Sequence, residues 1–158
     1  MTTLAIGDAA PAFTLPDAEG QPVSLSDFGP GRVVVYFFPA ALTPGCTTQA
    51  VDFNTHLDDF EHAGMKVVGI SPDPVSKLAT FADREHITFP MLSDADRSTL
   101  VAYGAFGEKM LYGKKVEGVL RSTFVVDVDE NGRGTVEVAQ YNVRAAGHVD
   151  KLRRDLGV

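Results

Sequence analysis

The feature that most constrains the fold is a continuous run of β-branched and aromatic residues, Val33–Phe38. Such a run, without polar alternation, predicts a strand covered on both faces near the centre of a sheet. A short loop follows, and an amphipathic segment then continues from Thr43 to His62. Thr43 is a favourable N-cap and Pro44 suits the first helical position. The sequence therefore predicts a buried strand, a tight loop and a helix in immediate succession.

The only cysteine of the 158 residues, Cys46, falls at the third position of this predicted helix. The first N–H groups of a helix have no partner within it and the helix dipole is positive there, so a thiolate is favoured over a thiol. The apolar stripe of the helix, which is expected to face the protein body, consists of Cys46, Ala50, Phe53, Leu57 and Phe60. A single cysteine is more often a small buried hydrophobe, but its place at the helix start favours a reactive nucleophile.

The rest of the chain alternates between predicted strands and helices. An N-terminal hairpin is expected from Ala12–Leu15 and Pro22–Leu25, and a long loop over Gly104–Gly118. The remaining strands are expected at Met65–Ile70, Phe89–Leu92, Leu120–Val128 and Gly134–Gln140, and the remaining helices at Val75–Glu85, Ala95–Tyr103 and Arg144–Leu156. Asp73 is expected to cap the helix that follows it.

This alternation predicts an α/β fold, in which helices flank a central sheet. The sheet is expected to be mixed, because Leu120–Val128 and Gly134–Gln140 are joined by a short turn and form an antiparallel hairpin. A single domain over residues 1–158 is expected from the length. Cys46 would lie at the carboxyl end of a strand, where open α/β sheets carry their sites.

Composition narrows the classes of partner. The formal net charge of −7 argues against a nucleic-acid surface or an anionic membrane as partner, and the longest apolar run is too short to span a bilayer. No lysine or arginine precedes Arg32, so the N-terminus lacks the features of a secretory signal and a cytoplasmic protein is expected. The four histidines are scattered along the chain, and no metal or cofactor is expected.

At Pro39, Thr43, Cys46 and Arg121 the sequence resembles a peroxiredoxin. The family's P-x-x-x-T-x-x-C motif is matched by Pro39, Thr43 and Cys46, and its distant arginine by Arg121. The Thr-Pro-Gly-Cys-Thr segment and the loop over residues 108–118 are similar to the bacterioferritin-comigratory or Q-type branch. The resemblance covers nearly the whole chain. It implies a thioredoxin-like fold and thiol-dependent reduction of hydrogen peroxide and alkyl hydroperoxides.

The resemblance also implies a role for each matched residue. Cys46 would attack the terminal peroxide oxygen and become a sulfenic acid. Arg121 would favour the thiolate through its charge and donate to the peroxide oxygens. The Thr43 hydroxyl would orient the peroxide, although a helix cap is its simpler role. The N–H groups of Gly45 and Cys46 would stabilise charge on the departing oxygen, and Pro39 would wall the site against water.

The sequence departs from the family pattern near Cys46. Many members of the branch carry a resolving cysteine five residues after the reactive one, and here that position is Val51. Thr48 and Gln49 stand where a lysine and a glutamate are usual. With no second cysteine, the sulfenic acid would be resolved by an external thiol, which could be thioredoxin, a glutaredoxin-like protein or a low-molecular-weight thiol. The resemblance favours a monomer.

Two other functions are compatible with the same residues. Thiol transfer is one, because Thr-Pro-Gly-Cys occupies the place of a thioredoxin-type C-x-x-C, but the missing first cysteine makes dithiol exchange impossible. The other is a non-turnover redox sensor or binding protein on a thioredoxin-like scaffold, with Cys46 oxidation as its signal. Repeated turnover with a thiol donor distinguishes an enzyme from a sensor, which reacts once.

Overall fold

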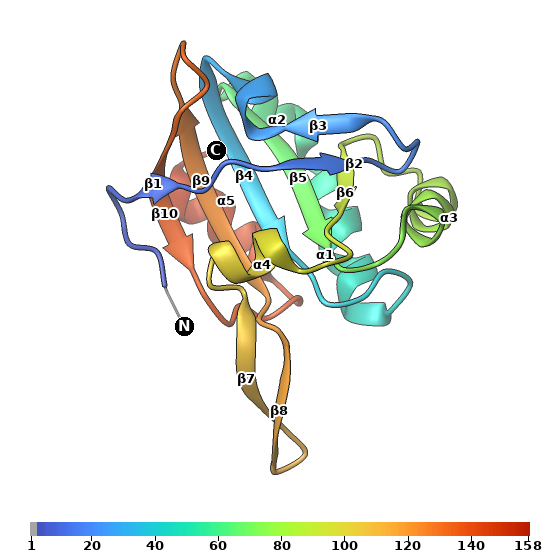
Figure 1. Ribbon diagram of the computed structural model, residues 1–158. Coiled ribbons are helices and arrows are strands. Elements are labelled where there is room, and N and C mark those ends of the chain that lie inside the picture. Colours follow the sequence, from blue (N-terminus) through green and yellow to red (C-terminus); the bar gives the residue numbers. More distant parts are fainter. Residues whose placement is uncertain (1–2) are drawn as a thin grey trace.

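The computed structural model describes residues 3–158 and is built on a six-stranded mixed sheet in the order β1-β10-β9-β4-β5-β6 (Figure 1). Its strands are β1 (Ala9–Ala10), β4 (Gly31–Phe37), β5 (Met65–Ser71), β6 (Met91–Ser93), β9 (Ser122–Val128) and β10 (Gly134–Gln140). β4, β5 and β6 run parallel, whereas β9 pairs antiparallel with β4 and β10 antiparallel with β9. The predicted central strand and mixed sheet are confirmed.

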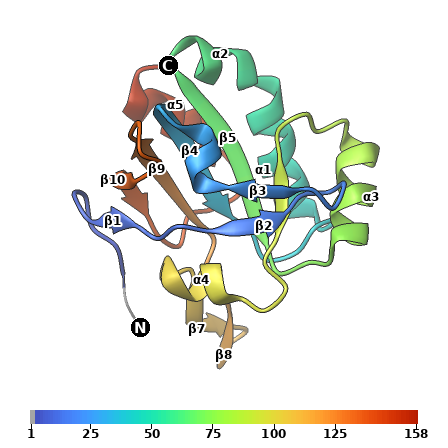
Figure 2. The ribbon, with the colours of Figure 1, turned by 45° about the horizontal axis from the view of Figure 1, so that its top comes forward.

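Side chains of β4 alternate between two apolar clusters, one on each face of the sheet. The cluster that contains Tyr36 packs beneath the helices α1 (Pro44–Thr55), α2 (Leu57–His62), α3 (Val75–Glu85) and α5 (His148–Leu156). The cluster that contains Phe37 packs beneath the short helices η1 (Leu25–Phe28) and α4 (Ser98–Ala102) and the N-terminal hairpin of β2 (Thr14–Pro16) and β3 (Pro22–Ser24). Both views show α4 on the face opposite α1 (Figures 1 and 2). The predicted N-terminal hairpin is confirmed.

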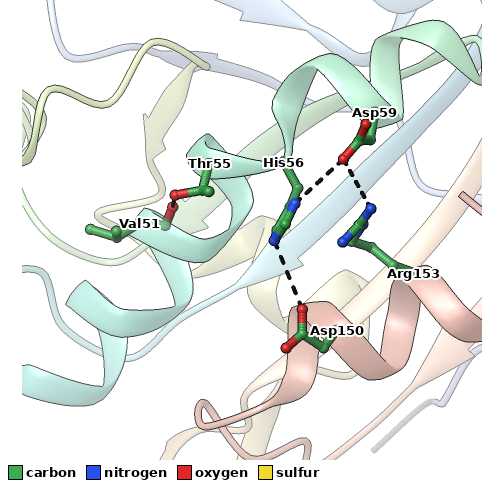
Figure 3. A network of polar contacts seen from close by, with 6 residues as sticks. All are labelled: Val51, Thr55, His56, Asp59, Asp150 and Arg153. Atoms are coloured by element: carbon green, nitrogen blue, oxygen red, sulfur yellow. Dashed lines mark hydrogen bonds and ion pairs between the residues drawn. The ribbon is translucent and has the colours of Figure 1, made fainter.

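The helix predicted to reach His62 without interruption is in fact two helices. α1 ends at Thr55, and α2 begins at Leu57. The Thr55 hydroxyl donates back to the Val51 carbonyl at 2.8 Å, an interaction that weakens a helix at that turn. His56 lies at the break, between the carboxylates of Asp59 at 3.4 Å and Asp150 on α5 at 3.8 Å (Figure 3). Polar contacts to α5 thus hold the break in place.

The segment predicted to be a long loop is a hairpin of β7 (Phe106–Leu111) and β8 (Lys114–Val119) that projects from the body (Figure 1). Tyr112 and Gly113 connect the strands with φ angles of +52° and +79°. Two successive left-handed residues form the kind of turn that fits the twist of a hairpin. The loop prediction is wrong, because the Tyr-Gly pair is a much weaker turn signal than Asn-Gly or Asp-Gly and yet forms the turn here.

His148 starts α5, four residues later than the predicted start, and is buried against the sheet. Its Nε2 lies 2.9 Å from the Thr123 hydroxyl on β9, and its ring packs edge-on against Phe53. Burial, followed by the charges of Lys151 and Arg121, lowers the pKa of His148 to about 4, against an opposing effect of Asp155. The folded protein therefore holds His148 neutral over a pH range in which a solvated histidine is protonated.

This environment predicts a loss of stability on mild acidification. The unfolded chain takes up the His148 proton below about pH 6.5, whereas the folded chain takes it up only near pH 4, so stability falls as the pH drops between these values. Between pH 7.5 and 5.5 we expect this residue to account for about 1 kcal/mol of the free energy of unfolding, a figure that allows for solvent at one edge of the ring. Urea denaturation of His148→Gln, compared with wild type, measures the difference.

The matched control is His62→Gln, at an exposed histidine of α2. It should show the same pH dependence as wild type. An unchanged pH dependence in His148→Gln would mean that His148 is not held neutral in the folded protein.

Candidate active site

Cys46 occupies the third position of α1 and is 1% exposed. The predicted helix start is confirmed, since Thr43 takes the N-cap position with extended backbone and Pro44 begins the helix. The sulfur belongs to the apolar cluster beneath α1, beside Phe38, Ala50 and Phe53. A buried sulfur at a helix N-terminus is shielded from bulk water and lies where the dipole favours negative charge.

Arg121, the second predicted catalytic residue, lies beside this sulfur. It lies between β8 and β9, and its Nη2 is 3.3 Å from Cys46 Sγ. Its Nη1 donates to Gln49 Oε1 at 2.6 Å. The two nitrogens of one planar guanidinium therefore engage two residues of the same helical turn, a geometry that a lysine ammonium does not reproduce.

Gln49 is a site residue whose role the sequence did not reveal. It is completely buried, its Oε1 holds Arg121, and its Nε2 has no partner among residues 3–158. Its position one turn after Cys46, on the buried face of α1, was the available signal. Gln49 therefore fixes the orientation of the guanidinium beside the sulfur.

Tyr36, on β4, lies under the same turn. Burial raises the pKa of Tyr36 far above its ordinary value, the negative charge of Cys46 raises it further, and the charge of Arg121 lowers it. Its ring stacks on Phe53 with centroids 4.6 Å apart, and its buried hydroxyl has no partner among the residues described. Tyr36 thus provides a neutral, rigid floor for the site.

The Thr43 hydroxyl does not cap the helix that it precedes. It is exposed and donates to the Ala40 carbonyl at 2.7 Å, within the loop between β4 and α1. Leu42, just before it, has a φ of +68°, which costs a residue with a side chain roughly 1 kcal/mol or more. The loop before Cys46 is therefore held in a strained shape, with the Thr43 hydroxyl on its outer side.

Asp73 ties this loop to the end of β5. Its Oδ2 accepts the Ala41 N–H at 2.7 Å and the Ser71 hydroxyl at 2.8 Å, and its Oδ1 pairs with Lys77 at 3.1 Å. The prediction that Asp73 caps α3 is wrong, because its carboxylate is committed to the loop, and Pro74 takes the N-cap position instead. This anchor fixes the loop against the strand and compensates for its strain.

Gly45 and Pro39 lie at opposite sides of the site. A Cβ at Gly45 would come within 3.4 Å of both Arg121 Nη2 and the Ala145 side chain, so a small residue is needed there. Pro39 is half-buried and lines a cavity of about 610 Å³ that the β7–β8 hairpin borders on its other side. The structure thus brings Gly45, Cys46 and Arg121 into direct proximity and places Pro39 at the loop's edge.

Residues 3–158 contain neither a metal-binding cluster nor a membrane-spanning helix. No three histidine, cysteine, aspartate or glutamate side chains gather in a way that would hold a metal ion. None of the helices described has the length and apolar character needed to cross a membrane.

Comparison with known proteins supports the resemblance. The model of the AhpC/TSA family matches residues 6–133. A putative peroxiredoxin of Mycobacterium tuberculosis is 64% identical over 157 residues, which cover 99% of this chain and 98% of the relative. Peroxiredoxin Bcp of Escherichia coli is 41% identical over 150 residues, or 95% of this chain and 94% of the relative.

A solved structure shows the same fold. The bacterioferritin comigratory protein of Xanthomonas campestris, studied for its alkyl peroxide reduction activity, superposes with a TM-score of 0.82 at 35% identity and covers 92% of this chain and 90% of its own. Sequence, fold and the Cys46–Arg121 contact thus agree: this chain belongs to the AhpC/TSA family and is a peroxiredoxin, a thiol-dependent peroxidase with a thioredoxin-like fold.

Proposed function

We propose that the chain is a single-domain, one-cysteine peroxidase that reduces hydrogen peroxide and alkyl hydroperoxides at Cys46 and is recycled by an external thiol. The observation that carries the proposal is the 3.3 Å contact between Arg121 Nη2 and Cys46 Sγ. The alkyl peroxide reduction studied in the Xanthomonas campestris relative supports the wider substrate range. The absence of a second cysteine supports resolution from outside the chain.

In the first step, the Cys46 thiolate attacks the terminal oxygen of the peroxide. An S–O bond forms, the O–O bond breaks, and the alkoxide or hydroxide leaves and takes a proton to become an alcohol or water. Arg121 stabilises the thiolate and donates to the peroxide oxygens, and the Gly45 and Cys46 N–H groups face the charge that develops. Thr43 would bind the peroxide after its hydroxyl leaves Ala40, and Pro39 would border the entry.

In the second step, an external thiol reduces the Cys46 sulfenic acid. Val51, which stands at the position of the resolving cysteine in many relatives, is about one-third exposed on α1 and offers no sulfur. The thiol would belong to thioredoxin, a glutaredoxin-like protein or a low-molecular-weight compound. We propose that the protein acts in the cytoplasm, where reducing conditions keep a lone cysteine free, and that it acts as a monomer.

The direct test of the first step is a brief pulse of one equivalent of hydrogen peroxide in the presence of a sulfenic-acid trap, followed by intact-protein mass spectrometry. Wild type should be trapped completely at one site, and Cys46→Ser should not be trapped. The variant also separates Cys46 from the methionines, which can gain oxygen too. Repeated peroxide consumption with a thiol donor identifies an enzyme, whereas a single oxidation without recycling would support a redox sensor.

Cys46→Ser should abolish peroxide consumption and leave the fold intact, because serine is nearly isosteric with cysteine but its hydroxyl is a far weaker nucleophile. Circular dichroism and urea denaturation check the fold, and a peroxide electrode measures consumption. Residual consumption in this variant would place the reaction at another residue.

Arg121→Lys should slow sulfenic-acid formation about a hundredfold, because the lysine keeps the charge but loses the fork that spans Cys46 and Gln49. Arg121→Ala should be slower still, since the charge is lost as well. Rapid-quench measurement of trapped Cys46 gives the rate constants. If Arg121→Lys reacts at the wild-type rate, the charge alone suffices and the two-residue contact has no catalytic role.

Gln49→Leu should slow the same step about tenfold, because Arg121 Nη1 then loses an acceptor worth roughly 1.5–3 kcal/mol to a charged group. Gln49→Glu retains an acceptor for Arg121 Nη1, so its rate of sulfenic-acid formation should stay within about threefold of wild type. The slower rate of Gln49→Leu is expected because the guanidinium loses its orientation. Equal slowing in both variants would indicate a general packing defect rather than positioning of Arg121.

A further inference from the structure

A cavity lies where the chain passes from β10 into α5, on a segment that contacts the active site. Its volume is about 490 Å³ and its walls come almost entirely from residues 140–151. Its polar and charged lining residues are Gln140, Asn142, Arg144, His148 and Lys151. A cavity of this size suits a small molecule of a few hundred daltons, and the peroxide substrate itself needs far less space.

The charge of this cavity is opposite to that of the protein as a whole, which has a net charge of −7. Arg144 is exposed and makes no ion pair with any of residues 3–158. Lys151 pairs with Asp155 at 3.2 Å, so its charge is largely met. His148 is buried and neutral, with Nε2 at Thr123. The unmet charge in the cavity is therefore the Arg144 guanidinium, which binds carboxylates well.

The segment that lines the cavity also contacts the active site. The Val143 N–H donates to the Arg121 carbonyl at 2.9 Å. Ala145 reaches Gly45, where an added Cβ would lie 3.4 Å from both Ala145 and Arg121 Nη2. The segment of residues 143–146 thus connects the cavity with the side of the active site that carries Gly45 and Arg121.

We infer that this cavity binds the reductant of the second step: a low-molecular-weight thiol that carries a carboxylate, which Arg144 holds while the thiol reaches Cys46. The inference rests on the proposed function and specifies the thiol that it leaves open. A ligand of this kind would use the charge, the volume and the position of the cavity together.

The chemistry balances with two equivalents of the thiol. The first thiolate attacks Sγ of the Cys46 sulfenic acid, an S–S bond forms, the S–O bond breaks, and hydroxide leaves and is protonated to water. The second thiol attacks the outer sulfur of the mixed disulfide. It releases the Cys46 thiolate and the oxidised small-molecule disulfide, so the two thiols supply the two electrons that the peroxide consumed.

The test separates oxidation from reduction. Wild type, Arg144→Glu and Arg84→Glu are each oxidised with one equivalent of hydrogen peroxide and then mixed with glutathione, a carboxylated thiol, or with 2-mercaptoethanol, a neutral one. Rapid quench and mass spectrometry follow the loss of the sulfenic acid. Arg84, an exposed residue of α3 outside the cavity, gives the control the same change in net charge.

We expect the glutathione rate of wild type to saturate with concentration, as binding requires. The ratio of the glutathione rate to the 2-mercaptoethanol rate should fall about tenfold in Arg144→Glu and stay at the wild-type value in Arg84→Glu. Because each variant is compared with itself, a general change in sulfenic-acid reactivity cancels from the ratio.

Three results would overturn the inference. The ratio could be the same in all three proteins, it could fall equally in both variants through net charge alone, or only an added thioredoxin-type protein could reduce the sulfenic acid. A failure of the proposed function is visible earlier in the same experiment, because no sulfenic acid would then form at Cys46 in the first mixing step.

Discussion

The site depends on the contact between Arg121 and Cys46, which joins residues 75 positions apart in the chain. The antiparallel pairing of β4 with β9 makes this contact possible. Its register places Phe37 opposite Ser122, so the strand that leads to Cys46 ends where the strand that follows Arg121 begins. Both residues therefore leave the sheet at the same edge. A shift of one residue in this register would turn every side chain of β9 to the opposite face, so the sheet itself fixes the catalytic pair.

Several unfavourable features lie around that contact. Leu42 adopts a left-handed backbone, and buried polar atoms of Tyr36 and Gln49 have no partner among residues 3–158. Features of this kind persist where the surroundings over-determine the structure, and they cluster at functional sites. Here the surroundings are the Asp73 anchor of the loop and the aromatic cluster beneath α1. The stability of the rest of the fold thus maintains a site that is locally strained and ready to accept substrate.

The sequence predicted the part of the fold that local physics determines. The apolar run of β4, the start of α1 and the place of Cys46 follow from β-propensity, capping and the spacing of apolar residues. The break at His56 has a local contribution from the Thr55–Val51 contact, but its contact with Asp150 comes from a helix distant in sequence and could not be predicted. The same is true of Gln49, whose role depends on Arg121. Asp73 is the clearest example. Its position in the sequence suits a helix cap, but its carboxylate instead accepts the Ala41 N–H. Capping propensity depends on residues adjacent in sequence and therefore cannot anticipate a tertiary hydrogen bond.

Because Val51 provides no resolving thiol, the rest of the chain must admit an external thiol to the sulfenic acid. In a chain with its own resolving cysteine, the second thiol is tethered and its effective concentration is high, so no external thiol has to reach the sulfenic acid itself. With Val51 there, every catalytic cycle begins its second half as a bimolecular encounter with a sulfur that is 1% exposed. Selection then falls on the residues that flank the path to the sulfur, and residues 143–146 form that flank on the side of Arg144. Because position 51 carries no cysteine, access of the external thiol to the sulfur depends on the charge of the segment that contains Arg144, almost a hundred residues later. The reactivity of the sulfur is not what links the two positions.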